Sequence, residues 1–439
     1  MMLPPENTAM HLFSTRFRRR AQATLRLFFV SLIPVAAVVA AELEPFADSP
    51  HRVGLADSRI GYESEAYRTD SKVVIEVSGI RQALDKLSSE TPLGLPAVGE
   101  GAKAAEIDLG RQLFFDRRLS ANDTLSCAMC HIPEQGFTQN ELATPVGHQG
   151  KGVRRNVPSL YNVVFVQQLF LDGRESSLVE QIWSPLLAHN EMANQDRQSV
   201  IAKIATIETY AQQFEGLYSG GLSEHSLGLA LAAYQRALLS GDSDFDRWYF
   251  EDGALSIDHY SAEAALGFAL FQEKGCIDCH QMGDNVSLFS DGGFYNTGIG
   301  YLRQQRGVEL DKVQLAPGVY VVPLVSAETE TFIDDGRAEV TGQSEDRWQY
   351  RTPSLRNVAI TFPYMHDGSL PTLESVVAYY AGNGSKDPLQ DVRISDMTIT
   401  VDEQQALVAF LRTLTSNQVD ALVSDARSVE IGERGAAGL

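Results

Sequence analysis

Apolar residues recur along most of this chain with the period of a helix, and not with the alternation of a strand. Near the C-terminal end five of them fall on one helix face: Ala406, Leu407, Phe410, Leu411 and Leu414. The stretch EHSLGLALAAYQRALLSG, residues 224–241, has the same spacing. Because residues three and four apart share one face of a helix, both stretches are predicted to be amphipathic helices, and the fold is predicted to be mainly α.

One helical signature, Gly-x-x-Leu-Phe, occurs twice, each time shortly before a pair of cysteines. Its residues are Gly110, Leu113 and Phe114 in the first copy and Gly267, Leu270 and Phe271 in the second. Ser261 is predicted to cap the second of these helices, since serine is a common residue at a helix start.

A second repeated motif follows each cysteine pair, NVPSLYNV at 156–163 and RTPSLRNV at 351–358. In both copies an Asp-Gly pair stands 14 residues after the proline, at Asp172 and Asp367. This order predicts an internal duplication, with tandem domains at residues 100–257 and 258–418. The second copy has a longer insertion that includes LAPGVYVVPLV, residues 315–325, where a short strand pair is expected.

The first 41 residues resemble an export signal. Arginines between positions 16 and 26 precede the apolar run LFFVSLIPVAAVVAA, and Ala40 and Ala41 suit cleavage. A retained membrane anchor is the alternative, although the run contains Pro34 and is short for a span of about 20 residues. We therefore expect a periplasmic protein. Residues 42–99 are assigned to an N-terminal extension and residues 419–439 to a C-terminal tail.

All four cysteines stand in two copies of one pattern, Cys127-Ala-Met-Cys130-His131 and Cys276-Ile-Asp-Cys279-His280. Cys-x-x-Cys-His is the spacing of c-type haem attachment, in which the thiols bond the haem and the imidazole binds its iron. A zinc site, a redox dithiol and structural disulfides are the alternatives, but they leave the repeated histidine unexplained. The sequence predicts two covalently bound c-type haems, each in a cytochrome c-like domain.

The acidic character of the chain limits its partners. Its formal net charge is −21 at pH 7, which argues against a nucleic-acid partner and favours a basic redox protein. A merely solvated acidic surface is the alternative.

The two copies differ where a second iron ligand would stand. At 27 residues after the repeat proline, the first copy has Pro185 and the second has Tyr380. A phenolate can bind ferric iron and a proline side chain cannot, so one open and one closed haem are expected. The alternatives are Tyr379 as the ligand, or Tyr380 as a packed aromatic.

Gln181 and Glu191 flank Pro185 in the sequence. A carboxylate beside an open haem can move a proton between peroxide oxygens, so Glu191 is a candidate acid-base group. A surface glutamate without such a role is the alternative.

With these motifs, the chain resembles the bacterial di-haem cytochrome c peroxidase and MauG family over residues 104–417. The matching motifs are LGRQLFFDRRLSANDTLSCAMCH, RRNVPSLYNV, DGRESSLVEQ, FALFQEKGCIDCH and RTPSLRNVAITFPYMHDGSLPTLESVV. The resemblance implies a peroxidatic haem in domain one, an electron-transfer haem in domain two, and reduction of hydrogen peroxide to water. It implies His131 and His280 as proximal ligands, Glu191 as the distal acid-base group, and Gln181 and Pro185 as the distal pocket.

Further sites follow from the same resemblance. A calcium ion between the haems would bind Asn156 and, through carbonyl oxygens, Thr361 and Pro363, a donor set that suits a hard cation; turn caps are the alternative. His148 resembles a loop histidine that blocks the peroxidatic haem, with a solvent-exposed loop histidine as the alternative. His366 is similar to a family position beside the second haem, where a propionate contact is expected.

Two residues depart from the peroxidase pattern. Tyr380 stands where the peroxidases have methionine and resembles the MauG branch; an anionic oxygen ligand lowers the potential of a haem relative to methionine. Leu171, in LFLDGR, stands where the family commonly has a tryptophan between the haems, so inter-haem transfer is expected to be slower or rerouted.

The leading hypothesis is an exported peroxidase that takes electrons from a small donor protein, a c-type cytochrome or a cupredoxin. The alternatives are a MauG-like oxidase that acts on a protein substrate and a non-enzymatic di-haem electron carrier. The family resemblance also suggests a homodimer.

Overall fold

The computed structural model describes residues 91–99, 101–251, 260–306, 313–316, 319–321 and 334–429. All of them belong to one compact unit, residues 74–439. The predicted export signal and most of the predicted N-terminal extension lie outside the described residues. Within the described ranges, no helix is both long and apolar enough to cross a membrane.

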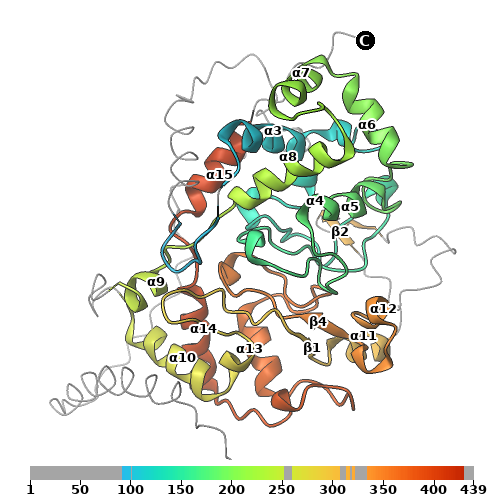
Figure 1. Cartoon of the computed structure of the whole chain (residues 1–439). Helices are drawn as coiled ribbons and strands as arrows, with labels where there is room; N and C mark the ends of the chain where they lie inside the picture. The colour runs from blue at the N-terminus through green and yellow to red at the C-terminus, as the bar shows by residue number, and fades with distance from the viewer. Residues whose placement is uncertain are drawn as a thin grey trace, which may run out of the picture. The chain divides into compact units, whose positions relative to one another are not determined.

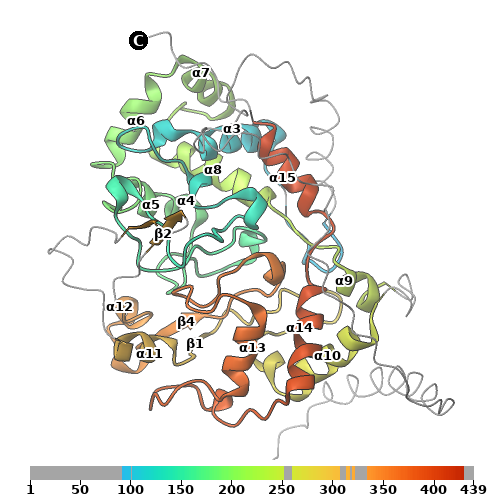
Figure 2. The same cartoon turned by 180° about the vertical axis from the view of Figure 1, so that it is seen from behind.

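Helices dominate the described residues, which confirms the predicted mainly α fold. The first half contains α3 (Ala104–Phe115), α4 (Leu178–Gln181), α5 (Trp183–Leu187), α6 (Arg197–Ala205), α7 (Glu208–Leu217), α8 (Glu224–Ala237) and α9 (Asp244–Tyr249). The second half contains α10 (Ala262–Glu273), α11 (Ile299–Arg306), α12 (Ala338–Thr341), α13 (Leu373–Ala381) and α14 (Val401–Arg412), and α15 (Val419–Arg427) follows it. Figures 1 and 2 show their arrangement.

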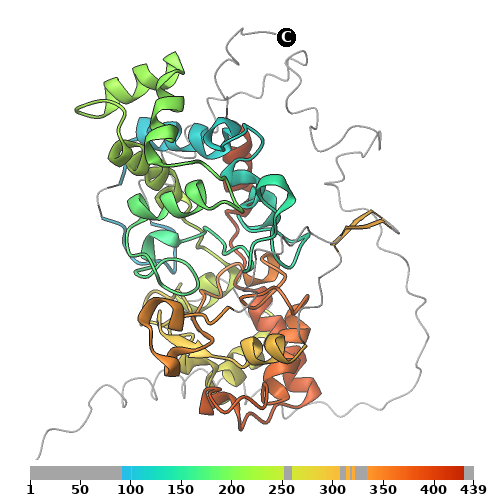
Figure 3. The same ribbon diagram turned by 90° about the vertical axis from the view of Figure 1, so that its right-hand side faces the viewer.

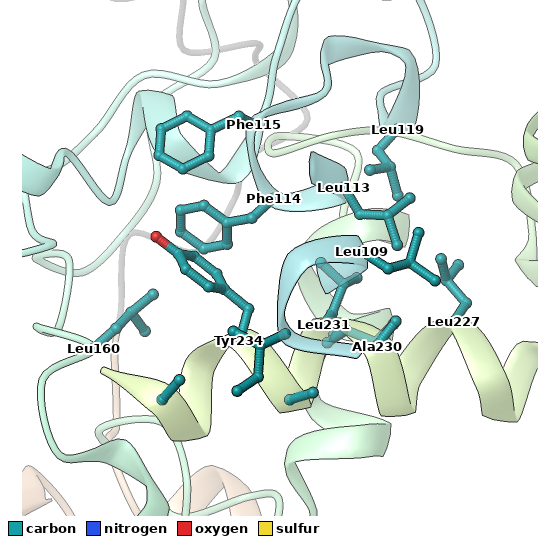
Figure 4. Close-up of a cluster of buried hydrophobic side chains, with 14 of the residues drawn as sticks. Leu109, Leu113, Phe114, Phe115, Leu119, Leu160, Leu227, Ala230, Leu231 and Tyr234 are labelled. Atoms are coloured by element: carbon teal, nitrogen blue, oxygen red, sulfur yellow. The ribbon is translucent and has the colours of Figure 1, made fainter. Parts of the chain in front are cut away.

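The core of the first half lies where α3 crosses α8 (Figure 4). Phe114 of α3 packs edge-on against Tyr234 of α8, with ring centroids 5.2 Å apart. At the crossing, a Cβ on Gly110 would lie 1.9 Å from the carbonyl oxygen of Ala230. Only glycine permits this approach, so the repeated glycine of the helical signature sets the distance between the two helices.

The core of the second half lies where α10 packs against α14. A Cβ on Gly267 would lie 1.8 Å from the carbonyl oxygen of Ala406. The Ser261 hydroxyl accepts from the backbone N–H of Ala264, so the predicted cap of α10 is confirmed. The apolar face predicted for the last repeat helix is buried at all five positions: Ala406, Leu407, Phe410, Leu411 and Leu414.

In the part of the chain that the structure describes, four short strands form two antiparallel pairs. The pair predicted in the insertion is present as β2 (Val313–Ala316) and β3 (Val319–Val321). The sequence analysis missed the other pair, β1 (Phe294–Asn296) with β4 (Gln349–Arg351). Each of these strands is only three residues long and has one buried residue, which is too short a pattern to identify a strand from the sequence.

The segment assigned to a C-terminal tail begins with a helix. In α15, Leu422 and Ala426 are buried in the core of the first half. Figures 1, 2 and 3 show this helix, in red, beside the blue α3 and among the elements of the first half. The chain therefore returns to its first half after completing the second.

Candidate functional site

A single 3₁₀ turn, Cys127–Met129, carries the first cysteine pair and leads directly to His131. The backbone N–H groups of Cys130 and His131 both donate to the Cys127 carbonyl, at 3.2 and 2.9 Å. Burial raises the pKa of both thiols to about 12. The turn therefore gathers two neutral thiols and one imidazole in a small protected volume.

His131 has one ring nitrogen engaged and one free for a metal. Its Nδ1 donates to the Phe137 carbonyl at 2.9 Å, which leaves the Nε2 lone pair available. Burial lowers the pKa of the imidazole, against the opposing effect of the Phe137 and Pro158 carbonyls. A neutral imidazole with its other nitrogen anchored is the form in which histidine binds iron.

The first cysteine pair opens onto a cavity of about 440 Å³. Cys127, Cys130 and His131 line it together with three predicted distal residues, Gln181 of α4, Pro185 of α5, and Glu191 in the loop that follows. The cavity thus brings Cys127 together with Glu191, 64 positions further along the chain. Its volume falls in the range of cofactor pockets, roughly 300–1,000 Å³.

Glu191 is held in the cavity wall by its own backbone. Its N–H donates to the Ala188 carbonyl at 2.9 Å, and its carbonyl accepts from the His148 N–H at 2.9 Å. Burial raises the pKa of the Glu191 carboxyl, and Arg174 opposes this effect. A carboxyl with a raised pKa is suited to exchange protons near neutral pH.

His148 lies next to the Glu191 loop, although its side chain does not line the cavity within the described residues. The residue is half-buried, and its Nδ1 is buried without a hydrogen-bond partner in the described part of the chain. The backbone bond to Glu191 therefore links the two residues, while the imidazole points elsewhere.

The second cysteine pair repeats this arrangement on the 3₁₀ turn Cys276–Asp278. His280 Nδ1 donates to the Phe289 carbonyl at 2.8 Å, and burial lowers the pKa of the imidazole. Burial raises the pKa of the Cys276 and Cys279 thiols to about 11. His280, too, offers a free Nε2 to a metal.

Tyr380, near the end of α13, lies close to this second pair. Burial raises the pKa of its phenol, and Tyr379 and both thiols add to the shift. The hydroxyl of Tyr379 instead donates to the Thr297 carbonyl at 2.7 Å. Of the two tyrosines, Tyr380 is therefore the one whose hydroxyl stays available beside the cysteines.

Residues from both halves meet beside the first cavity. Leu171 lines the cavity, and its carbonyl accepts from the backbone N–H of Arg351 on β4 at 2.8 Å. Next to Arg351, the Tyr350 ring stacks on the His366 ring with centroids 3.8 Å apart. Burial lowers the pKa of His366 to about 4, and its Nε2 is buried without a partner among the described residues.

No tryptophan lines the first cavity within the described ranges. Trp183 comes nearest in sequence, between the lining residues Ile182 and Ser184, and its ring lies buried under the Arg197 guanidinium at 4.9 Å. Leu171 stands where the family commonly has a tryptophan, and no other tryptophan lines this part of the described cavity wall.

The candidate calcium ligands also lie where the halves meet. Asn156 donates from its Nδ2 to the Ala143 carbonyl at 2.9 Å, and its backbone N–H donates to the His366 carbonyl at 2.7 Å. This orientation leaves the Asn156 Oδ1 free for a cation. Thr361 lies against Gly136, whose added Cβ would meet its methyl group at 2.7 Å.

Sequence reasoning missed several polar residues of the cavity wall. Arg154, Arg155 and Arg174 line it, and guanidinium groups are suitable partners for the carboxylates of a bound cofactor. The signal was present in RRN and DGR, two of the motifs already noted. The sequence did not show that these arginines belong to the cavity wall, because Asp334, the ion partner of Arg155, is 179 positions away.

At the first cysteine motif the thiol pair, the free imidazole nitrogen and the cavity fit a haem, and the second motif repeats the thiol pair and the imidazole, which is the arrangement of a haem protein. The family model for di-haem cytochrome c peroxidase matches residues 104–254. The chain is 33% identical over 315 residues to the methylamine utilization protein MauG of Methylorubrum extorquens, covering 70% of this chain and 78% of that protein. It therefore belongs to the di-haem cytochrome c peroxidase and MauG family, whose members carry haem cofactors and are oxidoreductases.

Other similar proteins come from both branches of the family. The cytochrome-c peroxidase IdrP1 of Denitromonas iodatirespirans is 33% identical over 346 residues, covering 74% of this chain and 87% of that protein. The crystal structure of a MauG-like protein associated with microbial copper homeostasis is 27% identical, with a TM-score of 0.60, and the match covers 78% of this chain and 97% of that chain. The identities do not separate a peroxidase from a MauG-like oxidase.

Proposed function

We propose that this protein is a periplasmic di-haem peroxidase that reduces hydrogen peroxide to water. The observation that carries the proposal is the first cavity. Glu191, Gln181 and Pro185 line it together with Cys127 and His131. Pro185, whose side chain cannot bind iron, lines this cavity, whereas Tyr380 lies beside the second cysteine pair. The first site is thus the reactive one, and the second receives electrons from a c-type cytochrome or a cupredoxin.

In this function each side chain of the first site has a separate role. A haem held by Cys127, Cys130 and His131 would supply the iron at which peroxide is reduced. The Glu191 carboxylate takes the proton of the inner peroxide oxygen and returns it to the outer oxygen, which leaves as water. In total, two electrons from the donor protein and two protons convert one hydrogen peroxide to two waters. Gln181 donates a hydrogen bond that orients the peroxide.

This assignment includes covalent haem attachment at Cys127, Cys130, Cys276 and Cys279, and export through residues 1–41. Attachment of c-type haem takes place in exported proteins, so the two features support each other. The tandem domains, 100–257 and 258–418, are products of an internal duplication. The matched glycine contacts of Gly110 and Gly267 support it.

A calcium ion bound by Asn156, Thr361 and Pro363 belongs to the same proposal, with the free Asn156 Oδ1 as its support. His148 is the loop histidine that blocks the peroxidatic haem in this proposal, supported by its backbone bond to Glu191. His366 contacts a propionate of the second haem through its unpartnered Nε2. Chelator treatment of the haem-loaded protein is expected to change the spectrum of the haems, and restored calcium to reverse it; an unchanged spectrum contradicts the calcium site.

The test of peroxidase function uses haem-loaded protein, hydrogen peroxide and a reduced small cytochrome or cupredoxin. We expect steady oxidation of the donor that Glu191→Gln abolishes and Glu208→Gln leaves unchanged, because Glu208 is exposed on α7. Absence of turnover with every donor tried, in protein with both haems bound, contradicts the proposal.

A MauG-like oxidase of a protein substrate is the second candidate, and Tyr380 beside the second cysteine pair favours it. Tyr380→Met separates the two functions, since a peroxidase keeps its turnover with methionine as ligand and the oxidase loses its activity. A plain electron carrier requires two low-spin ferric haems that peroxide does not change, which electron paramagnetic resonance detects directly.

A further inference from the structure

Helix α15 follows the second half in sequence, yet it is anchored on the first half at two charged contacts. Arg111 of α3 donates from Nη1 to the Asp425 carboxylate at 2.7 Å and to the Asp425 carbonyl at 3.0 Å. Both side chains are buried. Two residues further on, Arg427 donates through Nε and Nη2 to the two carboxylate oxygens of Glu134.

Glu134 lies in the turn that positions the acceptor of the His131 hydrogen bond. The turn Pro133–Gln135 ends at Gly136 in the left-handed region, with φ of 71°. The Phe137 N–H closes the turn on the Ile132 carbonyl at 3.0 Å, while the Phe137 carbonyl accepts from His131 Nδ1 at 2.9 Å. A shift of this turn therefore moves the Phe137 carbonyl relative to the imidazole.

The connection from α14 to α15 is bonded to both halves. In the connection from α14, the Leu414 carbonyl accepts from the Asn357 N–H at 3.0 Å. The Ser416 N–H donates to Asn357 Oδ1 at 2.9 Å, and the Ser416 hydroxyl donates to the Gly241 carbonyl. Since both ends are held, α15 cannot slide along the first half without breaking these bonds.

We infer that α15 is a positioning element for His131. Through Arg427 and Glu134 it holds the turn that presents the Phe137 carbonyl, and so sets the strength of the hydrogen bond from His131 Nδ1. A stronger bond at Nδ1 makes the imidazole more basic toward iron at Nε2. The inference rests on the proposed function only in that His131 is the ligand of the first haem; it does not require peroxide turnover.

The decisive experiment compares Arg427→Ala with Arg412→Ala in the full-length, haem-loaded protein. Arg412 is the matched control because it also forms an exposed ion pair, with Glu374 at 2.7 Å, but in the second half. The measurements are the iron–histidine stretching band of the reduced first haem, by resonance Raman spectroscopy, and separate redox titrations of the two haems.

In Arg427→Ala we expect the stretching band to move to lower frequency and the reduction potential of the first haem to rise, because a weaker Nδ1 hydrogen bond makes His131 less anionic. Arg427→Lys, which keeps the charge but loses the paired geometry, is expected to shift both by a smaller amount. Arg412→Ala is expected to leave the first haem unchanged.

A second variant, Leu422→Ala, loosens α15 without touching a charge, since Leu422 is 1% exposed in the first core. It is expected to shift the same band in the same direction. A wild-type band in both Arg427→Ala and Leu422→Ala overturns the inference, and so do equal shifts at both haems. A protein that shows the expected shift but no peroxide turnover contradicts the proposed function and leaves this inference intact.

Discussion

Arg356 and Asp246 form a fully buried ion pair, with side chains 1% and 0% exposed. Arg356 donates to both Asp246 oxygens at 2.8 and 2.9 Å, and also to the carbonyls of Ser287 and Gly94. Arg356→Met leaves the carboxylate buried and unpaired, which costs about 3–5 kcal/mol in comparable cases. Because Asp246 keeps two hydrogen bonds from Ser243, at 2.8 and 2.9 Å, we expect a loss of about 3 kcal/mol, at the lower end of the range.

Urea unfolding of the haem-loaded protein, followed by circular dichroism, measures this loss. The double variant Arg356→Met/Asp246→Asn is expected to recover part of it, because no buried charge remains. The neighbouring pair Arg247–Asp242 is the control: Arg247 is 41% exposed, so Arg247→Met is expected to cost no more than about 1 kcal/mol. A cost below about 1 kcal/mol for Arg356→Met itself refutes the reasoning from buried charge.

Three further predictions concern the site and its scaffold. Glu191→Gln is expected to lower peroxide turnover by about 10²–10⁴-fold. In the wild type, the carboxylate of Glu191 is the reactive form and burial raises its pKa, so turnover is expected to fall on acidification at a higher pH than for an ordinary glutamate. A turnover rate that does not change between neutral pH and about pH 4 contradicts this role. Tyr380→Met is expected to raise the reduction potential of the second haem only, as measured by spectroelectrochemical titration, and an unchanged potential excludes Tyr380 as a ligand. Gly267→Ala is expected to destabilise the protein, since the added Cβ would lie 1.8 Å from the Ala406 carbonyl oxygen. Gly216→Ala is the control: no atom lies near its Cβ position on α7, so it is expected to stabilise the protein by up to about 1 kcal/mol. The thermal unfolding midpoint should fall in the first variant and rise in the second.

Local patterns in the sequence were sufficient for the helices and for the cysteine turns. The faces of α8 and α14 follow directly from apolar spacing, and Ser261 caps α10 as its position indicates. The spacing of Cys127, Cys130 and His131 specifies its own turn, because the bonds that close it span only three or four residues.

Contacts between distant segments could not be predicted in this way. The strand pair β1 and β4 joins residues 294–296 to 349–351, and nothing in either triplet identifies its partner. Arg111 and Asp425 are separated by 314 positions, so that each appears in the sequence as an ordinary solvated charge on a helix. The carbonyl of Phe137 is a backbone group, and its role depends on a turn conformation and not on a side-chain type.

The late position of α15 in the chain has a consequence for biosynthesis. When the first half emerges during translation, Arg111 has no Asp425 to pair with, and the apolar surface that Leu422 and Ala426 later cover is open to water. Domains generally fold in order of synthesis, but this one cannot finish before the last described helix of the chain is made. The turn beside Cys127 and Cys130, where we propose that haem is attached, therefore stays less covered until almost the whole polypeptide has been made.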